Sequence, residues 1–297
     1  MIKGLVSCIV PTYKRPDLII GAIESILEQT YVNLEVLVID DNEPYDQYSI
    51  ETKKKINLMT DRRVRYIQQE HHVNGAKARN IGIENAHGEY VAFLDDDDRW
   101  CRDKLEKQVD FLENNKDYAG VSCLYIYYRN GQLIRKNPVY TDENLHRKVL
   151  ERSVSVGTCT LLLKKEVLDQ TDYFNVNLNR HQELQLILDF LIKGKIGIIQ
   201  EYLVKGNMDF GENRANATNV VEYKQAFFDA VKKHFDIYDN KIQKNIYAAH
   251  YFEIILVALR NKNLKLVIKY LWKIGFNIQA YKNLCKRYKM RRENSSD

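Results

Sequence analysis

The chain has 297 residues, of which 45% are hydrophobic and 29% charged, and its formal net charge at pH 7 is +5. This length exceeds one typical domain, and the composition is that of an ordinary globular protein, which excludes wholesale disorder and an extended coiled coil. The charge is uneven, because residues 260–297 carry a net charge of +9 and the residues before them about −4.

Five cysteines are scattered through the chain, and no two of them form a Cys-x-x-Cys pair. This spacing argues against a zinc site or a disulfide framework and is typical of a reducing compartment. The N-terminal apolar run is short and has no signal-peptide cleavage site, so we expect cytosolic synthesis without export. No apolar run approaches the roughly 18 residues that a spanning helix needs.

The first hundred residues alternate between strand and helix patterns. Apolar, β-branched runs predict strands at Leu5–Val10, Leu34–Ile39, Val64–Ile67 and Tyr90–Leu94. Helical spacing predicts helices at Asp17–Gln29, Tyr48–Leu58 and Ala76–Ala86, and the chain beyond residue 220 reads as helical throughout. Near-continuous apolar strands separated by helices are typical of a parallel sheet covered on both faces, so we predict an α/β fold.

Polar segments follow three of these strands: Pro11–Arg15, Asp40–Asn42 and Asp95–Asp98. Right-handed crossovers place such loops along one edge of the sheet, where ligands of open α/β sheets bind. Residues 10–16 contain no glycine, which excludes a dinucleotide-binding or P-loop turn after the first strand. A phosphate ligand would therefore bind to a cation that carboxylates hold, rather than to backbone N–H groups.

Four consecutive aspartates, Asp95–Asp98, give the clearest chemical signal. Mutual repulsion and desolvation both oppose their ionisation, and a bound cation relieves both effects. Carboxylate oxygens are hard ligands, which favours Mg²⁺ or Mn²⁺. The alternative is a solvated acidic turn that also caps the next helix.

Four segments in this order resemble the family 2 glycosyltransferases of the GT-A fold: Val6–Tyr13, Val38–Asn42, Ala78–Gly82, and Gly88–Tyr90 with the aspartates. Phe174–Leu186, which contains Arg-His-Gln-Glu, resembles a segment of many bacterial members. The resemblance covers residues 5 to about 205. It implies a Rossmann-like catalytic domain at 1–220, with a mostly parallel central sheet flanked by helices, and a basic helical region at 221–297.

The resemblance also implies a nucleotide-sugar-binding set comprising Pro11, Thr12, Tyr13, Asp40, Asp41, Lys77, Arg79, Asp95 and Asp96. Within this set Tyr13 stacks on the base and Asp41 accepts the N–H of a uracil-like ring. Asp97 matches the metal ligand, and Asp95 and Asp96 match positions near the ribose and the metal's water shell. Tyr13 could instead be a surface turn residue, and Asp40 a helix cap or turn residue.

Lys77 and Arg79 fall on the predicted third helix and could hold a diphosphate, with Lys77 in the first turn if the helix begins near Gly75. Arg79 could equally pair with one of the aspartates, and the two roles are compatible. We expect Asp98 to cap a helix that begins near Trp100.

Glu183 matches the catalytic acidic position of the family and would act as the single general base of an inverting transfer. It could instead be an acidic residue that favours the start of the helix that follows it. Arg180 and His181 are expected to line the donor or acceptor pocket, although His181 could be a structural hydrogen-bond donor. Many relatives carry a second acid two positions after the base, where this chain has Gln185.

The sequence therefore predicts a metal-dependent transfer of a sugar from a nucleoside diphosphate, most simply UDP, to a hydroxyl of a glycan or lipid-linked acceptor in surface polysaccharide synthesis. A nucleotidyltransferase is disfavoured because the glycine-rich loop is missing. A non-catalytic sugar-nucleotide-binding or scaffold subunit remains an alternative.

Lysines 262, 265, 269 and 273 recur at helical spacing opposite apolar residues, and a basic run follows at 286–292. Such a helix suits peripheral contact with an anionic membrane, here the inner face of the plasma membrane. The alternative is that its apolar stripe packs on the catalytic domain. Nucleic acid is not expected as a partner, because no reading motif accompanies the charge.

Overall fold

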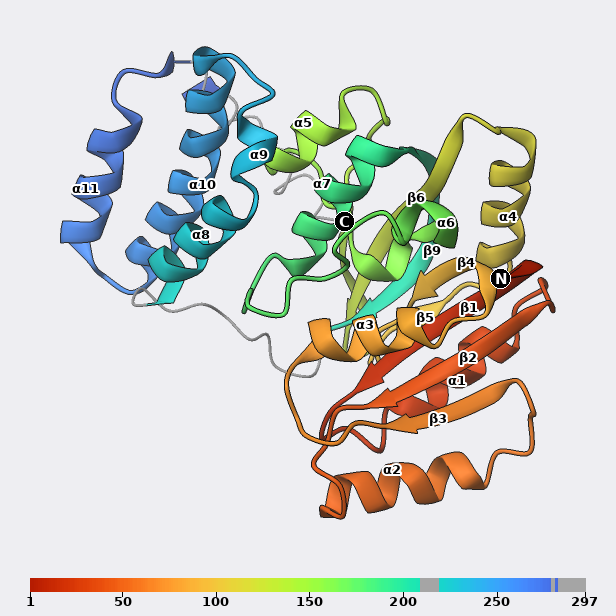
Figure 1. Cartoon of the computed structure of the whole chain (residues 1–297). Coiled ribbons are helices and arrows are strands. Elements are labelled where there is room, and N and C mark those ends of the chain that lie inside the picture. Colours follow the sequence, from red (N-terminus) through yellow and green to blue (C-terminus); the bar gives the residue numbers. More distant parts are fainter. Residues whose placement is uncertain (209–218, 279–280, 283–297) are drawn as a thin grey trace.

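The computed structural model describes residues 1–208, 219–278 and 281–282. A mixed β-sheet with helices on both faces forms its centre, and C-terminal helices stand beside it (Figure 1). The strands are β1 Ile2–Thr12, β2 Leu34–Asp40, β3 Val64–Gln68, β4 Gly88–Phe93, β5 Arg99–Trp100, β6 Tyr118–Arg129, β7 Gln132–Lys136, β8 Leu162–Lys164 and β9 Lys195–Asn207. The helices are α1 Ile19–Leu27, α2 Gln47–Asn57, α3 Gly75–Glu84, α4 Lys104–Asn114, α5 Leu145–Leu150, the 3-10 turn η1 Thr158–Thr160, α6 Lys165–Leu168, α7 Gln182–Lys193, α8 Asn219–Ala230, α9 Lys232–Phe235, α10 Asn240–Arg260 and α11 Leu264–Ile274.

The strand order is β3-β2-β1-β4-β8-β6-β9-β5, and β7 pairs with the outer part of β6. The first four strands are parallel, as predicted, whereas the pairs made by β8, β7 and β5 are antiparallel and β6 pairs with β9 in parallel. The α/β prediction is therefore confirmed, and the second half of the sheet is mixed. Because the order reverses at β1, the loops after β1 and β4 diverge and leave a crevice at this edge.

Each face of the sheet buries its own core. In β1, Ile9 contributes to the core beneath α3 and α7, while Cys8 and Val10 contribute to the core beneath α1 and α4. This alternation is the period of two that a strand imposes on its side chains. The four cysteines among the described residues are free thiols, as expected.

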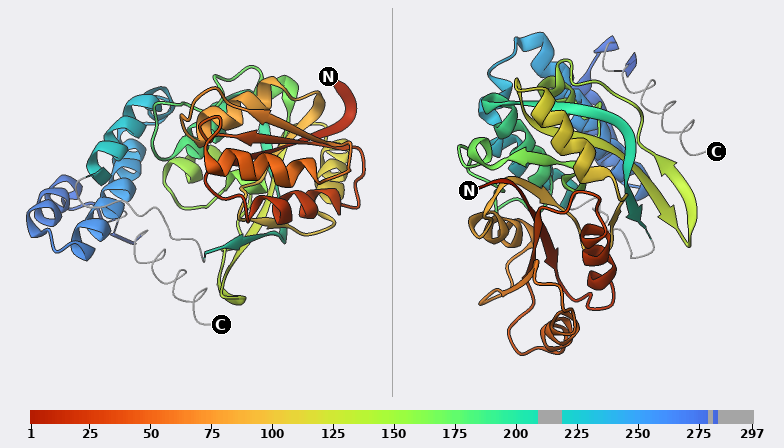
Figure 2. Two further views of the ribbon diagram at one scale, coloured as in Figure 1. Left: turned by 90° about the horizontal axis from the view of Figure 1, so that it is seen from below. Right: turned by 90° about the vertical axis from the view of Figure 1, so that its right-hand side faces the viewer.

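The described C-terminal residues are helical, as predicted, and α10 and α11 lie to one side of the sheet (Figure 2). The aromatic side chains of Phe227 and Phe235 nevertheless belong to the larger core beneath α7. A division into separate units at residues 220/221 stays a prediction. The basic run at 286–292 lies outside the described residues.

Helix α11 packs on α10 with Val267, Tyr270 and Ile274, and it leaves Ile268 and Trp272 60% and 85% exposed. Within the part of the chain that the structure describes, α10 rather than the sheet covers α11, and it covers only part of the apolar surface of α11. Among the described helices, we find none with the length and apolar character needed to cross a bilayer.

Candidate active site

Two cavities meet at the carboxyl end of β4. The small cavity, of about 650 Å³, lies between the loops that follow β1, β2, β3 and β4. The large cavity, of about 1050 Å³, lies beneath the segment 152–159 and the start of α7. Both are lined by Arg79 and Asp95, so this pair forms their common wall.

The aspartate run supplies the acidic side of the small cavity. Thr12 Oγ1 donates to Asp96 Oδ2 at 2.9 Å, and Arg15 Nη1 lies 3.1 Å from Asp96 Oδ1 and 2.7 Å from Asp97 Oδ2. Burial raises the pKa of Asp96 to about 6, and burial and then the charge of Asp95 raise the pKa of Asp97. Arg15 therefore offsets only part of the negative charge gathered here.

Asp98 does not cap a helix, so that prediction is wrong. Its buried carboxylate accepts hydrogen bonds from the Tyr125 hydroxyl and from the backbone N–H of Asn207, the latter at 3.3 Å. Residues Arg99–Trp100 form β5 and pair with β9, and the next helix begins only at Lys104. Asp98 points into the protein because the chain continues as a strand.

The carboxylates of the small cavity fit a hard divalent cation. Asp95, Asp96 and Asp97 all line it, and the guanidinium of Arg15 already marks a cation position beside Asp97. Among the described residues, Asp95, Asp98 and Cys159 also bring ligand atoms within 4.8 Å of one another. Burial raises the pKa of the Cys159 thiol well above its usual value, however, and a protonated thiol is a poor ligand for Mg²⁺ or Mn²⁺.

Tyr13 and Asp41 meet at the opposite side of the small cavity, together with His72. The rings of Tyr13 and His72 stack with centroids 3.9 Å apart and an interplanar angle of 11°. His72 Nδ1 lies 3.0 Å from Asp41 Oδ2, and Gln69 Nε2 donates to Asp41 Oδ1 at 2.6 Å. Asp41 thus supports an aromatic pair at the cavity wall, and its role as an acceptor for a base stays a prediction.

Two predicted binding residues line neither cavity. The carboxylate of Asp40 is buried and accepts from Asn42 N at 3.0 Å and from the Tyr66 hydroxyl at 2.5 Å, which matches the alternative of a turn residue. Lys77 lies in the first turn of α3, as predicted, where its backbone N–H is capped by Asn74 Oδ1 at 3.0 Å. Pro11, Thr12 and Tyr13 do line the small cavity.

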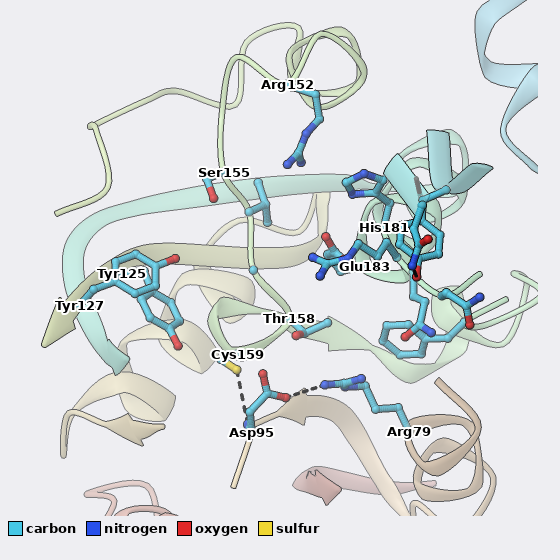
Figure 3. A pocket seen from close by; sticks show the side chains of 18 residues that line it. Arg79, Asp95, Tyr125, Tyr127, Arg152, Ser155, Thr158, Cys159, His181 and Glu183 are labelled. Atoms are coloured by element: carbon cyan, nitrogen blue, oxygen red, sulfur yellow. Dashed lines mark hydrogen bonds and ion pairs between the residues drawn. The ribbon is translucent and has the colours of Figure 1, made fainter. Parts of the chain in front are cut away.

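Arg79 and Asp95 form an ion pair of 2.5 Å, drawn as a dashed line in Figure 3. The side chain of Arg79 is 15% exposed, and its guanidinium also lies 5.7 Å from the centre of the Phe174 ring. The predicted pairing of Arg79 with an aspartate is confirmed. It places a buried cation on the wall that the two cavities share.

Glu183 lies in the first turn of α7 and lines the large cavity together with Asp95 and Arg79 (Figure 3). Arg180 and His181 line the same cavity, so the structure brings together these three predicted residues from the 180–183 segment. Gln185 Oε1 accepts from Asn175 N at 2.8 Å. Gln185 thus links α7 to the segment that precedes it and has a structural role.

Three basic residues that the structure places at the cavities were not identified from the sequence. Arg15 and His72 lie in the loops after β1 and β3, at the predicted ligand-binding edge, so topology was the signal that could have found them. Arg152 comes from the segment after α5, and no local pattern marks it.

The family model described as Glycosyl transferase family 2 matches residues 7–170 of the chain. An uncharacterized glycosyltransferase of Rickettsia felis is 33% identical over 214 residues, which are 70% of this chain and 34% of that protein. In Escherichia coli, the UDP-Glc:alpha-D-GlcNAc-diphosphoundecaprenol beta-1,3-glucosyltransferase WfaP is 31% identical over 192 residues, which are 64% of this chain and 71% of that protein. The chain spans about a third of the length of this relative and of a second uncharacterized glycosyltransferase, from Rickettsia conorii.

Two solved structures share the fold. Residues 1–349 of S. aureus TarS in complex with UDP-GlcNAc superpose with a TM-score of 0.65 at 16% identity, over 98% of this chain and 90% of that one. The mannosyltransferase PcManGT from Pyrobaculum calidifontis, in complex with GDP-Man and Mn²⁺, gives a TM-score of 0.54 at 16% identity, over 96% and 75%. At this identity the likeness shows the fold, which is the predicted GT-A architecture.

Proposed function

The chain belongs to glycosyltransferase family 2, and we propose that it transfers a sugar from a UDP-sugar to a hydroxyl of a glycan or lipid-linked acceptor, with inversion at the anomeric carbon. The observation that carries this proposal is the common wall of the two cavities, Asp95 and Arg79. A donor whose diphosphate lies at this wall has its nucleotide in the small cavity and its sugar facing the large one.

The small cavity supplies what a nucleoside diphosphate requires. Tyr13 or His72 offers an aromatic face for the base, and Asp41 offers an acceptor for the imide N–H of uracil. Arg15 and Arg79 supply guanidinium groups for phosphate oxygens. A uracil nucleotide is favoured because the base side of the cavity presents a carboxylate acceptor.

The proposal assigns a divalent cation, Mn²⁺ or Mg²⁺, to Asp97, with Asp95 and Asp96 beside it. When bound, such an ion acts as a Lewis acid that neutralises charge on the departing diphosphate. PcManGT offers a parallel, since its structure holds Mn²⁺ with a nucleotide sugar. In this chain, Arg15 would move from Asp97 toward phosphate as the ion and the donor bind.

Glu183 is the proposed general base. It enters the large cavity from the start of α7, on the side away from the aspartate run, and among the described residues it and Asp95 are the carboxylates that line this cavity. Asp95 is paired with Arg79, so Glu183 is the carboxylate available to take a proton from an acceptor hydroxyl. A single base opposite the leaving group gives inversion.

The acceptor would enter the large cavity, where Tyr223 offers an aromatic ring for a sugar. The E. coli relative acts, by its name, on a diphosphoundecaprenol-linked sugar, which supports a lipid-linked acceptor in surface polysaccharide synthesis. Peripheral contact with the cytoplasmic side of an anionic membrane would bring such an acceptor within reach. The exposed apolar residues of α11 and the lysines beside them supply a surface of the right chemistry.

The proposal is tested by adding a panel of UDP-, dTDP- and GDP-sugars to the full-length protein with and without Mn²⁺. We expect UDP-sugars to raise the melting temperature and to release UDP slowly, both only with Mn²⁺. Stabilisation by none of the panel would contradict the proposal. Stabilisation without release of any nucleotide, even with added lipid-linked acceptors, would favour the alternative of a non-catalytic binding subunit.

A further inference from the structure

We propose that the C-terminal helices complete the large cavity: Lys224 of α8 and Glu253 of α10 are positioning residues that hold His181 and Arg152 on its wall. The inference rests on the proposed function, because His181 immediately precedes the helix that carries the proposed base, Glu183. Figure 3 shows Arg152, His181 and Glu183 around the same space.

Lys224 is the centre of this arrangement. Its side chain is 3% exposed, and its Nζ lies 3.0 Å from His181 Nε2 and 3.1 Å from His250 Nδ1. The same Nζ forms an ion pair with Glu253. An ammonium group has three N–H donors and no acceptor, and here each donor has an acceptor to meet.

These contacts define the protonation of both imidazole rings. A ring nitrogen that faces an ammonium must present its lone pair, so His181 Nε2 and His250 Nδ1 are acceptors. His250 Nε2 then donates to the carbonyl oxygen of Leu150 at 2.9 Å, and the proton of His181 must be on Nδ1. Burial, and then the charge of Lys224, hold the pKa of both histidines well below the usual value, so both rings are neutral.

Glu253 links Lys224 to Arg152. Arg152 Nε lies 3.2 Å from one carboxylate oxygen of Glu253, and Lys224 pairs with the other. Although burial alone would favour the neutral acid, the two cations hold the pKa of Glu253 well below its usual range. One carboxylate therefore ties α8 and α10 to the segment that follows α5.

The backbone gives independent support. Arg152 and His181 are two of the eight described non-glycine residues with positive φ, at 55° and 66°. Such conformations persist only where the surroundings fix them. Both residues line the large cavity, and both contact the Lys224–Glu253 pair.

The conformation of His181 also sets the position of Glu183. The carbonyl oxygen of His181 accepts from Gln185 N at 3.1 Å, which makes it part of the first turn of α7. Because its ring is neutral, His181 adds no positive charge at the start of α7, next to Glu183. Among the described residues, the titratable groups with the strongest electrostatic effect on the His181 ring are Lys224, Arg152, Glu253 and His250.

The test replaces Lys224 with Met in the full-length protein and uses Lys104→Met as a matched control. Lys104 is also fully buried, but it lies over the Trp100 ring, 3.9 Å from its centre, and lines neither cavity. Nitrogen-15 NMR of the imidazole side chains reports which ring nitrogen carries the proton. The signals of His181 are identified as those that disappear in His181→Asn. We expect the proton of His181 on Nδ1 in the wild type and in Lys104→Met, and on Nε2 in Lys224→Met.

Activity gives the second measurement. In Lys224→Met we expect release of UDP from a UDP-sugar to fall by roughly 10- to 100-fold, with the affinity for UDP unchanged. The loss should deepen from pH 7.5 to pH 6, because removal of the Lys224 charge raises the pKa of His181 and lets it take a proton. Lys104→Met should show no such pH dependence.

A wild-type His181 with its proton on Nε2 would overturn the inference. It would also be overturned if Lys224→Met kept the wild-type tautomer and pH profile. If the wild type releases UDP from no UDP-sugar, the proposed function fails, while the tautomer measurement still decides the positioning role.

Discussion

At the scale of single residues, the site is organised around one partly buried ion pair. Arg79 and Asp95 separate the acidic small cavity from the large cavity that holds Glu183. Removing Asp95 would leave the largely buried Arg79 guanidinium without its counter-ion, whereas the carboxylate of Asp95 is 38% exposed and would stay in contact with solvent without Arg79. The pair is therefore both a structural element of the wall and the place where donor phosphates would replace an existing contact.

Asp97 is predicted to carry the dependence on metal. In Asp97→Asn we expect the Mn²⁺-dependent affinity for UDP, measured by calorimetry, to fall at least about tenfold, because a neutral amide is a weaker ligand for a hard cation. Binding of UDP without Mn²⁺ should change little. Asp110→Asn, at an exposed position of α4, is the matched control. Equal Mn²⁺ dependence in Asp97→Asn and the wild type would contradict the assignment.

The residues that sequence reasoning located best lie where the chain turns at the end of a strand. The β1 and β4 tips were placed correctly because a strand pattern followed by polar residues determines both the edge and the order of the loops. The role of Asp98 was predicted wrongly because its carboxylate is buried against β9, a strand that comes about 100 residues later and pairs with β5. Arg152 could not be assigned, since its role comes from a contact with Glu253, which is distant in sequence.

At the scale of elements, the packing of α3 on β1 leaves no room for a side chain at Gly82. A Cβ on Gly82 would come within 2.3 Å of Ile9 Cγ2. Gly82 thus allows α3, which contains Arg79 and Lys77, to pack directly on β1, whose end lines the small cavity. The Ala-Arg-Asn-Ile-Gly segment therefore has a packing reason as well as a binding one.

Gly82→Ala should destabilise the protein, although alanine normally stabilises a helix relative to glycine by about 1 kcal/mol. We expect a loss of roughly 1–3 kcal/mol from overpacking against Ile9, measured by urea unfolding. Gly157→Ala is the control, because a Cβ there meets nothing within 4 Å. An unchanged or higher stability of Gly82→Ala would show that α3 can move away without cost.

Helix α11 is predicted to be the membrane-facing element. Ile268→Glu with Trp272→Glu should abolish cosedimentation with phosphatidylglycerol vesicles, because both apolar side chains are exposed beside a row of lysines. Ile237→Glu, at another exposed apolar position, should bind as the wild type does. Wild-type protein that ignores these vesicles, or binds neutral phosphatidylcholine vesicles equally well, would exclude this role.

At the scale of the whole molecule, a partly buried histidine couples stability to pH. Burial, and then the charge of His234, lower the pKa of His146 to about 4, whereas an unfolded histidine titrates near pH 6.5. Between pH 6.5 and pH 4, His146 is therefore protonated in the unfolded chain but neutral in the folded protein. This contribution to stability is present above pH 6.5 and is lost as the pH falls toward 4.

His146→Phe should accordingly make the free energy of unfolding less dependent on pH. Between pH 7 and pH 5 we expect the decline to be smaller than in the wild type by about 1–2 kcal/mol, measured by denaturant unfolding at each pH. His71→Gln is the control, since the His71 side chain is 81% exposed. An identical decline in His146→Phe and the wild type would contradict the prediction.

The sequence predicted the α/β core and the helical C-terminal region, because hydrophobic periodicity determines elements and their order. It did not predict how closely these parts are joined. Phe227 and Phe235 bury their rings in the larger core, and Lys224 reaches the wall of the large cavity. These contacts link positions more than forty residues apart along the chain, which no local pattern records.

The central claim, that Glu183 is the base of a glycosyl transfer, is tested most directly by UDP release in Glu183→Gln with a UDP-sugar, acceptor and Mn²⁺. We predict a loss of at least about 100-fold with the affinity for UDP unchanged, because the amide keeps the shape of the side chain but cannot take a proton. Glu166→Gln, which changes an exposed first-turn residue of α6 outside both cavities, should retain full activity. Wild-type turnover in Glu183→Gln would contradict the account.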